Sequence, residues 1–357
     1  MTPDQTPASL PEADTVPWED GESWIVRVHF HPGDQAPPVG APGLLGMVGF
    51  GGEAGFEAGA LPVARIPMPC LGLSPLWEAW YGRLPARYEQ ADAIHYGHNG
   101  EVLFGLLAAP GAEIEKATHQ AYRRLIALVR SAGYPHLVRV WNYFPDINGE
   151  LRGLERYRRF CLGRHRALAE TGYAFGADLP AASAIGIEGN RLWIYFLAAR
   201  RPAVQIENPR QLSAYRYPSR YGPRSPSFSR AMRLEDPATG TKQLFISGTA
   251  SIVGHETVHQ DDVEAQCAET LRNLRAVLAE AGAAPFPRAA GWKVYLRRPG
   301  DYPRIRELLE GSWEGELFFL AGDICRRDLL LEIEGVASLQ GTREPREGLH
   351  CRSPGLG

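Results

Sequence analysis

An internal repeat is the feature that most limits the folds open to this chain of 357 residues. Apolar residues recur at helical spacing over residues 114–129, and the same pattern recurs over residues 263–278. Each stripe leads to a glycine, Gly133 or Gly282, which suits the C-cap of a helix. The stripes and the glycines share one offset, 149 residues, so one structural unit is expected twice.

Strand-like segments surround both predicted helices in the same order. The first copy has strands at 138–143, 184–187 and 192–196, and the second has strands at 292–297, 317–320 and 329–333. A turn and a second helix follow the first strand of each copy, so the order β-β-α-β-α-β-β occurs twice. We therefore predict an α/β (α+β) fold whose sheets carry helices on one face. Residues 21–110 contain strand-like segments but no clear third copy.

We divide the chain into four parts. Residues 1–20 and 341–357 are rich in Pro, Gly and charge and are expected to be flexible tails. Residues 21–200 form the predicted N-terminal domain with a degenerate module, and residues 201–340 form the predicted C-terminal catalytic module.

Composition excludes several classes of protein. The 44% hydrophobic and 22% charged content is ordinary for a soluble protein, and the net charge of −3 argues against nucleic-acid binding. The longest apolar stretch, residues 192–199, is too short to cross a membrane. The five cysteines are widely spaced and no secretory signal is visible, which favours a cytoplasmic protein.

The densest chemical signal lies between residues 213 and 334. An Arg/Tyr run at 213–230 precedes a small-residue turn at 247–251, and an aliphatic strand with one carboxylate group, Glu332, follows. Cations, phenols and a tight turn are suited to binding a small dianion. Such a pocket with no metal or redox group does acid–base chemistry.

Several separated motifs resemble the chorismatase family, and the second module resembles the RidA-like fold. The motifs are residues 157–164, 179–186, 213–230 and 247–255, followed by Cys325 ahead of Glu332. The likeness covers roughly residues 95–337. It implies a RidA-like trimer condensed into one chain, a pseudo-trimeric monomer that needs no metal and no cofactor. It also implies cleavage of chorismate with release of pyruvate.

The resemblance assigns Glu332 as the catalytic acid, and the residue pattern is consistent with that role. On a strand, Glu332 and Glu334 share one face among aliphatic neighbours. Desolvation and like charge should raise the pKa of Glu332, so that it stays protonated near neutral pH. The alternative is a solvated residue at a sheet edge.

The resemblance also places Tyr157, Arg164, Tyr217 and Arg230 around the substrate. Arginine can bind both oxygens of a carboxylate, and the tyrosines can donate hydrogen bonds. Most other arginines in these segments are expected to be surface charge. A nucleic-acid site is the weaker alternative for the Arg/Tyr run.

Gly248, Thr249 and Ala250 form the predicted small-residue turn, which lets the backbone approach a ligand closely. A plain hairpin end is the alternative. In the family, a cysteine at the position of Cys325 is characteristic of members that form aromatic hydroxybenzoates, whereas Ala250 leans toward the hydrolytic type. Inert packing is the alternative for Cys325.

Residues 255–259 match the HExxH pattern of zinc proteases. Gly254 precedes the motif and the N-capping pair Asp261 and Asp262 follows it, so the segment is predicted to be a loop that enters a helix. We therefore expect no metal site there.

The expected activity is conversion of chorismate to pyruvate and 3- or 4-hydroxybenzoate. Two alternatives remain: hydrolysis to a dihydroxycyclohexadiene carboxylate, and a RidA-like module that binds a small carboxylate without turnover. Chorismate is the expected small-molecule partner, with no nucleic acid and no membrane.

Overall fold

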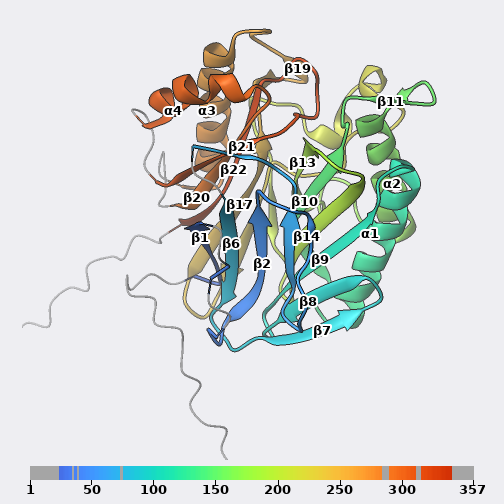
Figure 1. Ribbon diagram of the computed structural model, residues 1–357, viewed down its shortest axis with the longest axis vertical. Helices are drawn as coiled ribbons and strands as arrows, with labels where there is room; N and C mark the ends of the chain where they lie inside the picture. The colour runs from blue at the N-terminus through green and yellow to red at the C-terminus, as the bar shows by residue number, and fades with distance from the viewer. Residues whose placement is uncertain are drawn as a thin grey trace, which may run out of the picture.

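Three large β-sheets stand around a shared core, and two pairs of helices cover the outer faces of two of them (Figure 1). The predicted tails, residues 1–20 and 341–357, lie outside the described residues. The computed structural model describes residues 24–33, 36–37, 40–72, 75–283, 289–310 and 315–339.

The two predicted repeat helices are present at the expected offset. Helix α1 spans Ile114–Ser131 and helix α3 spans Val263–Glu280, so their first and last residues are each 149 positions apart. Gly133 and Gly282 follow them with φ of +83° and +76°, conformations that glycine adopts without strain. These glycines therefore end both helices in the same way.

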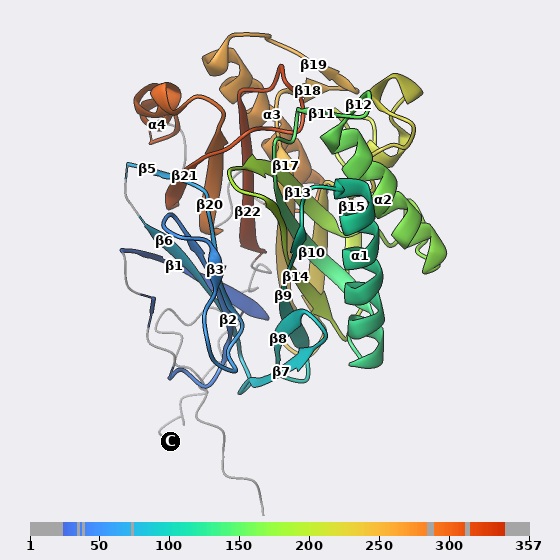
Figure 2. The ribbon, with the colours of Figure 1, turned by 45° about the vertical axis from the view of Figure 1, so that its right-hand side comes forward.

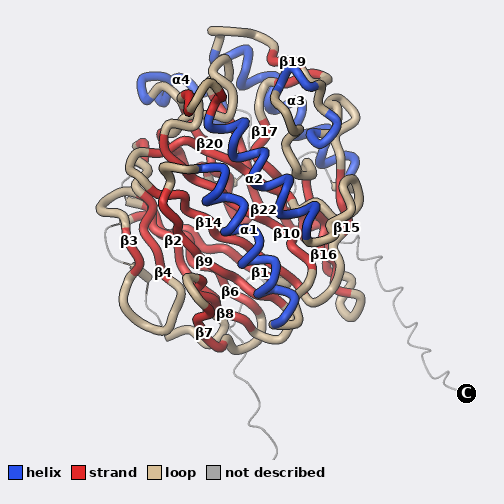
Figure 3. The backbone as a smooth tube through the Cα atoms, turned by 90° about the vertical axis from the view of Figure 1, so that its right-hand side faces the viewer, coloured by secondary structure: helices blue, strands red, loops and turns tan. Residues whose placement is uncertain are grey.

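The first helix-bearing sheet has the strand order β13-β10-β14-β9-β8-β7. Helix α2 (Arg156–Glu170) lies beside α1 on its outer face, as Figure 3 shows. The short hairpin β11-β12 (Glu150–Leu151 and Leu154–Glu155) precedes α2. The six strands are β7 (Arg87–Ala91), β8 (Ile94–His98), β9 (Val102–Pro110), β10 (His136–Pro145), β13 (Ala181–Ile187) and β14 (Arg191–Ala199).

The second helix-bearing sheet has the order β15-β16-β17-β22-β20-β21-β5 and is covered by α3 and α4 (Tyr302–Glu310). Three short 3-10 helices lie in its connections: Ala214–Arg216, Ser219–Tyr221 and Pro299–Asp301. Its main strands are β15 (Val204–Ile206), β16 (Ala231–Asp236), β17 (Thr241–Thr249), β20 (Ala289–Leu296), β21 (Leu317–Ala321) and β22 (Leu331–Leu339).

The sequence repeat is also a repeat of topology. The strand order β13-β10-β14-β9-β8 in one sheet corresponds to β21-β20-β22-β17-β16 in the other. The strand after the first helix has a parallel and an antiparallel neighbour in both cases. The predicted order β-β-α-β-α-β-β is therefore confirmed in both modules.

The third sheet comes from the N-terminal segment, where the sequence shows no clear third copy. Its order is β1-β6-β2-β4-β3, and the described residues before α1 contain no helix. Strand β5 (Cys70–Leu71) leaves this segment and pairs with β21, which ties it to the second helix-bearing sheet. Its strands are β1 (Val26–Pro32), β2 (Leu44–Phe50), β3 (Gly55–Phe56), β4 (Val63–Ile66) and β6 (Leu76–Gly82).

The inner faces of the three sheets bury one common core (Figure 2). Val48, Tyr143 and Tyr295 come from different sheets and are all fully buried there. Separate apolar clusters hold α1 and α2, and α3 and α4, against their sheets. Because apolar burial is the main stabilising contribution to folding, this shared core fixes the three sheets relative to one another.

Within the part of the chain that the structure describes, no helix combines the length and the apolar character that crossing a bilayer requires.

Candidate active site

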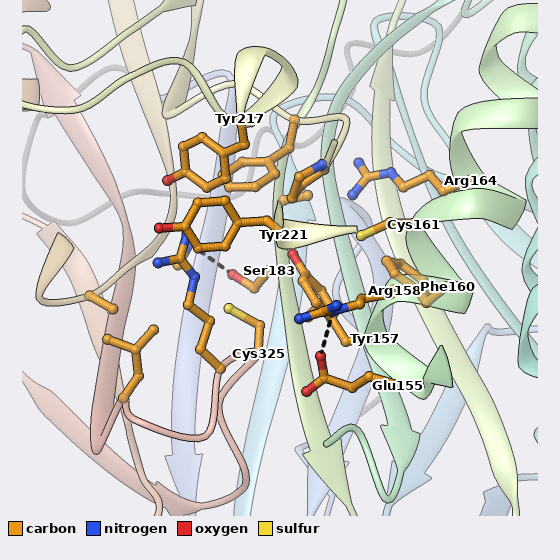
Figure 4. A pocket seen from close by; sticks show the side chains of 18 of the residues that line it. Glu155, Tyr157, Arg158, Phe160, Cys161, Arg164, Ser183, Tyr217, Tyr221 and Cys325 are labelled. Carbon is orange, nitrogen blue, oxygen red and sulfur yellow. Dashed lines mark hydrogen bonds and ion pairs between the residues drawn. The ribbon is translucent and has the colours of Figure 1, made fainter. Parts of the chain in front are cut away.

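A cavity of about 540 Å³ opens between the two helix-bearing modules, a volume suited to a small organic ligand. Figure 4 shows Tyr157 and Arg164 of α2 on one side of it, facing Tyr217, Tyr221 and Cys325. The structure thus brings together nearly all of the predicted site residues: Tyr157, Arg164, Tyr217, Arg230, Gly248, Ala250, Cys325 and Glu332.

Glu332 lies on β22, and its side chain is only 4% exposed. Its carboxylate group sits directly over Gly248, since a Cβ atom added to Gly248 would be 1.7 Å from Glu332 Oε1. A bulge in the pairing of β17 with β22, between Ile246 and Thr249, surrounds Gly248. The close approach therefore requires glycine at position 248.

The surroundings of Glu332 favour its protonated form. Burial and, after it, the nearby negative charge of Glu334 raise the pKa of Glu332, Arg139 and Arg230 lower it, and the net value is about 8. At neutral pH the side chain is therefore mostly a neutral carboxylic acid that can donate a proton.

Three arginines of the cavity have buried N–H groups without a hydrogen-bond partner among the described residues. These groups are Nε and Nη2 of Arg164, Nε of Arg230 and Nη2 of Arg326. A buried guanidinium group with unused donors is costly unless an anion satisfies it. A cavity with such donors suits a ligand that carries negative charge.

Aromatic rings and backbone carbonyl groups orient these arginines. The guanidinium group of Arg230 donates hydrogen bonds to Tyr217 Oη at 2.7 Å and to the Leu212 carbonyl group at 3.0 Å. The Arg326 guanidinium carbon lies 4.2 Å from the centre of the Tyr221 ring. Such cation–π contacts and hydrogen bonds hold a guanidinium group in place before a ligand arrives.

Tyr157 and Cys325 are neutral groups in this cavity. Burial raises the pKa of Tyr157 well above its ordinary value, and burial raises the pKa of Cys325 to about 12. The phenol group can donate a hydrogen bond but cannot act as a base near neutral pH. The thiol group stays protonated, so Cys325 can influence a reaction by its size and its apolar surface.

Thr249 does not line the cavity, in contrast to the prediction. Successive residues of a strand point to opposite faces, so Gly248 faces the cavity and Thr249 faces away from it. The Thr249 hydroxyl group donates a hydrogen bond to the Ser247 carbonyl group at 3.0 Å. The segment is the end of strand β17 with a bulge, and not the small-residue turn that we predicted.

The HExxH segment is a loop that leads into α3, as predicted, and it also contains a short strand. Glu256 and Thr257 form strand β19, His259 has φ of +59°, and Asp262 caps α3 by accepting a hydrogen bond from the Ala265 amide group at 3.0 Å. The two histidines therefore do not share a helical face. No cluster of metal-ligating side chains occurs among the described residues.

Ser183, Tyr221 and Arg326 are among the cavity residues that were not predicted as site residues. Tyr221 lies inside the Arg/Tyr run that was singled out, and Arg326 is adjacent to Cys325, so proximity was an available signal. Ser183 lies inside the motif at residues 179–186, but its hydrogen bonds to Glu334 and Gly248 appear only in the folded chain.

A buried carboxyl group and guanidinium groups with unused donors lie together in one cavity between the two helix-bearing modules. The family model described as chorismatase FkbO/Hyg5-like, N-terminal, matches residues 78–198. A 3-hydroxybenzoate synthase from Streptomyces hygroscopicus is 37% identical over 84% of this chain and 93% of its own length. The chain belongs to the chorismatase family.

Further comparisons agree with this assignment. A chorismatase from Streptomyces rapamycinicus is 40% identical over 73% of this chain and 82% of its own length. The crystal structure of a chorismatase superposes with a TM-score of 0.81 at 34% identity, covering 87% of this chain and 98% of the other.

Proposed function

We propose that this protein cleaves chorismate into pyruvate and a hydroxybenzoate. The observation that carries the proposal is Glu332, a buried carboxylic acid with a pKa of about 8 in a cavity lined with unpaired guanidinium donors. Chorismate is a dianion with an enol ether, so it requires both anion binding and a proton donor. The names of the relatives support the same substrate and product.

The two carboxylate groups of chorismate are bound by different arginines. Arg230 is near enough to Glu332 to lower its pKa, so it is placed to hold the enolpyruvyl carboxylate beside the carbon that receives the proton. Arg164 comes from α2 in the other module and is placed to hold the ring carboxylate. Tyr157 and Tyr217 donate further hydrogen bonds.

Glu332 begins the reaction by giving its proton to the terminal methylene carbon of the enolpyruvyl group, which becomes the methyl group of pyruvate. The ring hydroxyl oxygen then displaces the ether oxygen internally, its proton returns to the Glu332 carboxylate, and the resulting arene oxide rearranges to hydroxybenzoate. This route consumes no water, and the atoms of chorismate are divided completely between hydroxybenzoate and pyruvate. Addition of water instead yields the diene diol and pyruvate.

Two residues of the cavity influence which route is followed. Cys325 occupies space beside the acid with a neutral, weakly polar group, which disfavours an attacking water molecule. Ala250 lies after β17 on the cavity side. We favour the aromatic product because the cysteine is at the position characteristic of hydroxybenzoate-forming members.

Incubation of the purified protein with chorismate tests the proposal. Pyruvate is measured with a coupled lactate dehydrogenase assay, and the second product is identified by chromatography against authentic hydroxybenzoates and the diene diol. We expect equimolar pyruvate and hydroxybenzoate. Absence of pyruvate release would support the binding module instead, and a diene diol without an aromatic product would support the hydrolase.

We also propose that the chain works as a monomer. The three sheets bury a common core within one chain, which supplies the contacts that separate subunits of a trimer would make. Light scattering after size-exclusion chromatography should give a mass near 39.3 kDa. A mass near three times that value would reject the proposal.

A further inference from the structure

Glu334 lies two residues after Glu332 on the same face of β22, and its side chain is fixed by many donors. It is 1% exposed, and its two oxygens accept hydrogen bonds or ion pairs from five side chains in three strands. These partners are Arg139 (2.5 Å), Trp141 (2.8 Å), Ser183, Lys293 (2.7 Å) and Tyr295 (2.9 Å). A carboxylate group with this many donors is held as an anion.

The charges around Glu334 agree with that geometry. Burial alone would raise the pKa of Glu334, but Lys293 and Arg139 outweigh it and lower the pKa to about 2. Glu334 therefore keeps a permanent negative charge inside the protein, paired with Arg139 and Lys293 and close to the proposed acid.

The cluster extends into the third sheet. Lys293 also pairs with Glu78 of β6 at 2.7 Å, and Glu78 accepts a hydrogen bond from Tyr195 of β14 at 3.0 Å. Burial raises the pKa of Glu78, so of the two carboxylates on Lys293 it takes up a proton first. Every large sheet thus contributes a side chain to the cluster.

Ser183 connects this cluster to the acid. Its hydroxyl group donates a hydrogen bond to Glu334 and accepts one from the backbone N–H group of Gly248 at 2.9 Å. Gly248 lies directly beneath the carboxyl group of Glu332. Ser183 therefore holds both the Glu334 carboxylate group and the backbone of Gly248, which lies beneath the Glu332 carboxyl group.

We propose that Glu334 is a positioning residue whose fixed negative charge, acting together with burial of the acid, favours the protonated form of Glu332 at the working pH. The inference rests on the proposed function, because it gives Glu332 the role of proton donor. The new element is that the protonation state of Glu332 depends on Glu334, which does not line the substrate cavity. Side chains of other strands hold Glu334 in place.

The charged groups that face Glu332 determine whether its pKa rises or falls when the charge of Glu334 is removed. Glu334 is the anion among them, and Arg139 and Arg230 are cations. Tyr157, Tyr295 and Cys325 are neutral at pH 8, because burial raises the pKa of each. Removing the charge of Glu334 leaves two cations, which stabilise the ionised form of Glu332.

The test is the pH dependence of kcat/KM for chorismate in the variant Glu334→Gln. We expect the alkaline limb to move to lower pH by roughly 1 unit, because the acid ionises more easily. The variant Arg139→Gln removes a cation instead, so its limb should move to higher pH. Opposite shifts cannot arise from general loosening of the core.

Glu78→Gln is the matched control, because it also removes a buried carboxylate group that pairs with Lys293 at 2.7 Å. It should lower the melting temperature but leave the alkaline limb in place. The proposal is overturned if Glu334→Gln leaves the limb unchanged, or if Glu78→Gln moves it equally. If Glu334→Gln does not fold, the pH profile of Arg139→Gln alone tests the proposal. An alkaline limb of Arg139→Gln that is unchanged or moves to lower pH then rejects it.

A titration that needs no turnover separates this proposal from the proposed function. The carboxyl carbon of Glu332 is observed by NMR in protein labelled with ¹³C-glutamate, and Glu332→Gln identifies its signal. The midpoint should fall in Glu334→Gln even if chorismate were not the substrate. An unchanged midpoint together with normal pyruvate release would reject the role of Glu334 and leave the proposed function intact.

Discussion

At the scale of single residues, the proposed chemistry depends on the protonation of Glu332. The sequence placed Glu332 and Glu334 on one strand face, which was enough to expect a raised pKa. It could not reveal that Arg139 and Lys293, which are 195 and 41 positions away along the chain, hold Glu334 as an anion. Charge pairing of this kind depends on tertiary contacts, and no local pattern records it.

The pH profile tests the acid directly. We predict that kcat/KM falls above about pH 8, where Glu332 of the free enzyme ionises. The limb of kcat should lie at higher pH, because the carboxylate groups of bound chorismate add negative charge and neutralise Arg230. Initial rates from pH 5 to pH 10 check both limbs. A limb near pH 4.5, the ordinary value for glutamic acid, would contradict the expectation.

Cys325 controls the product in the proposed mechanism. The variant Cys325→Ala should shift product from hydroxybenzoate toward the diene diol, because the smaller side chain admits water beside the ring. Chromatography of the reaction mixture gives the ratio. Cys161→Ala, at another buried cavity cysteine, is the control and should retain the aromatic product. An unchanged ratio in Cys325→Ala would reduce that thiol group to packing.

At the scale of elements, the repeat could be read from the sequence because helices have distinct beginnings and ends. The apolar period gave the first residues of α1 and α3, and the glycines gave their ends to within two residues. The bulge at the end of β17 was mistaken for a turn, since small residues suit both. Side chains alternate between the two faces of a strand, so Gly248 faces the cavity and Thr249 faces away from it. A turn would not impose this alternation, and for that reason Thr249 was included among the predicted site residues.

Gly248 provides a test of the bulge. The variant Gly248→Ala should lose most activity, because its Cβ atom would meet Glu332 Oε1 at 1.7 Å and displace the acid. Gly55→Ala is the control, since it lies on strand β3 with nothing within 4 Å of an added Cβ atom. Steady-state rates and circular dichroism compare the two. Full activity of Gly248→Ala would show that the close approach is dispensable.

At the scale of the whole molecule, three sheets and one ion cluster form a single unit. The third sheet was not predicted as a further copy of the repeat, because no helices separate its strands among the described residues. The partners of the cluster lie as far apart in the chain as Glu78 and Glu334, so only the assembled fold shows that they meet. The same assembly buries the acid, and burial of an ionisable group has a cost in stability.

That cost gives a prediction for folding. The pKa of Glu332 is raised from 4.5 to about 8 on folding, so its contribution to stability is fully present below pH 4.5 and is lost as the pH rises through 8. Glu332→Gln lacks this dependence and should gain roughly 3 kcal/mol relative to the wild type between pH 5 and pH 8. Urea unfolding at both pH values measures the difference. If the difference in unfolding free energy between Glu332→Gln and the wild type were the same at pH 5 and at pH 8, Glu332 would not be buried in its protonated form.

The most direct measurement is the rate of pyruvate release from chorismate by Glu332→Gln, set beside its affinity for benzoate. We predict that turnover falls at least about 100-fold, the usual contribution of a general acid, while benzoate still binds because the shape of the cavity is kept. Retention of most of the wild-type rate would contradict the assignment of Glu332 as the proton donor.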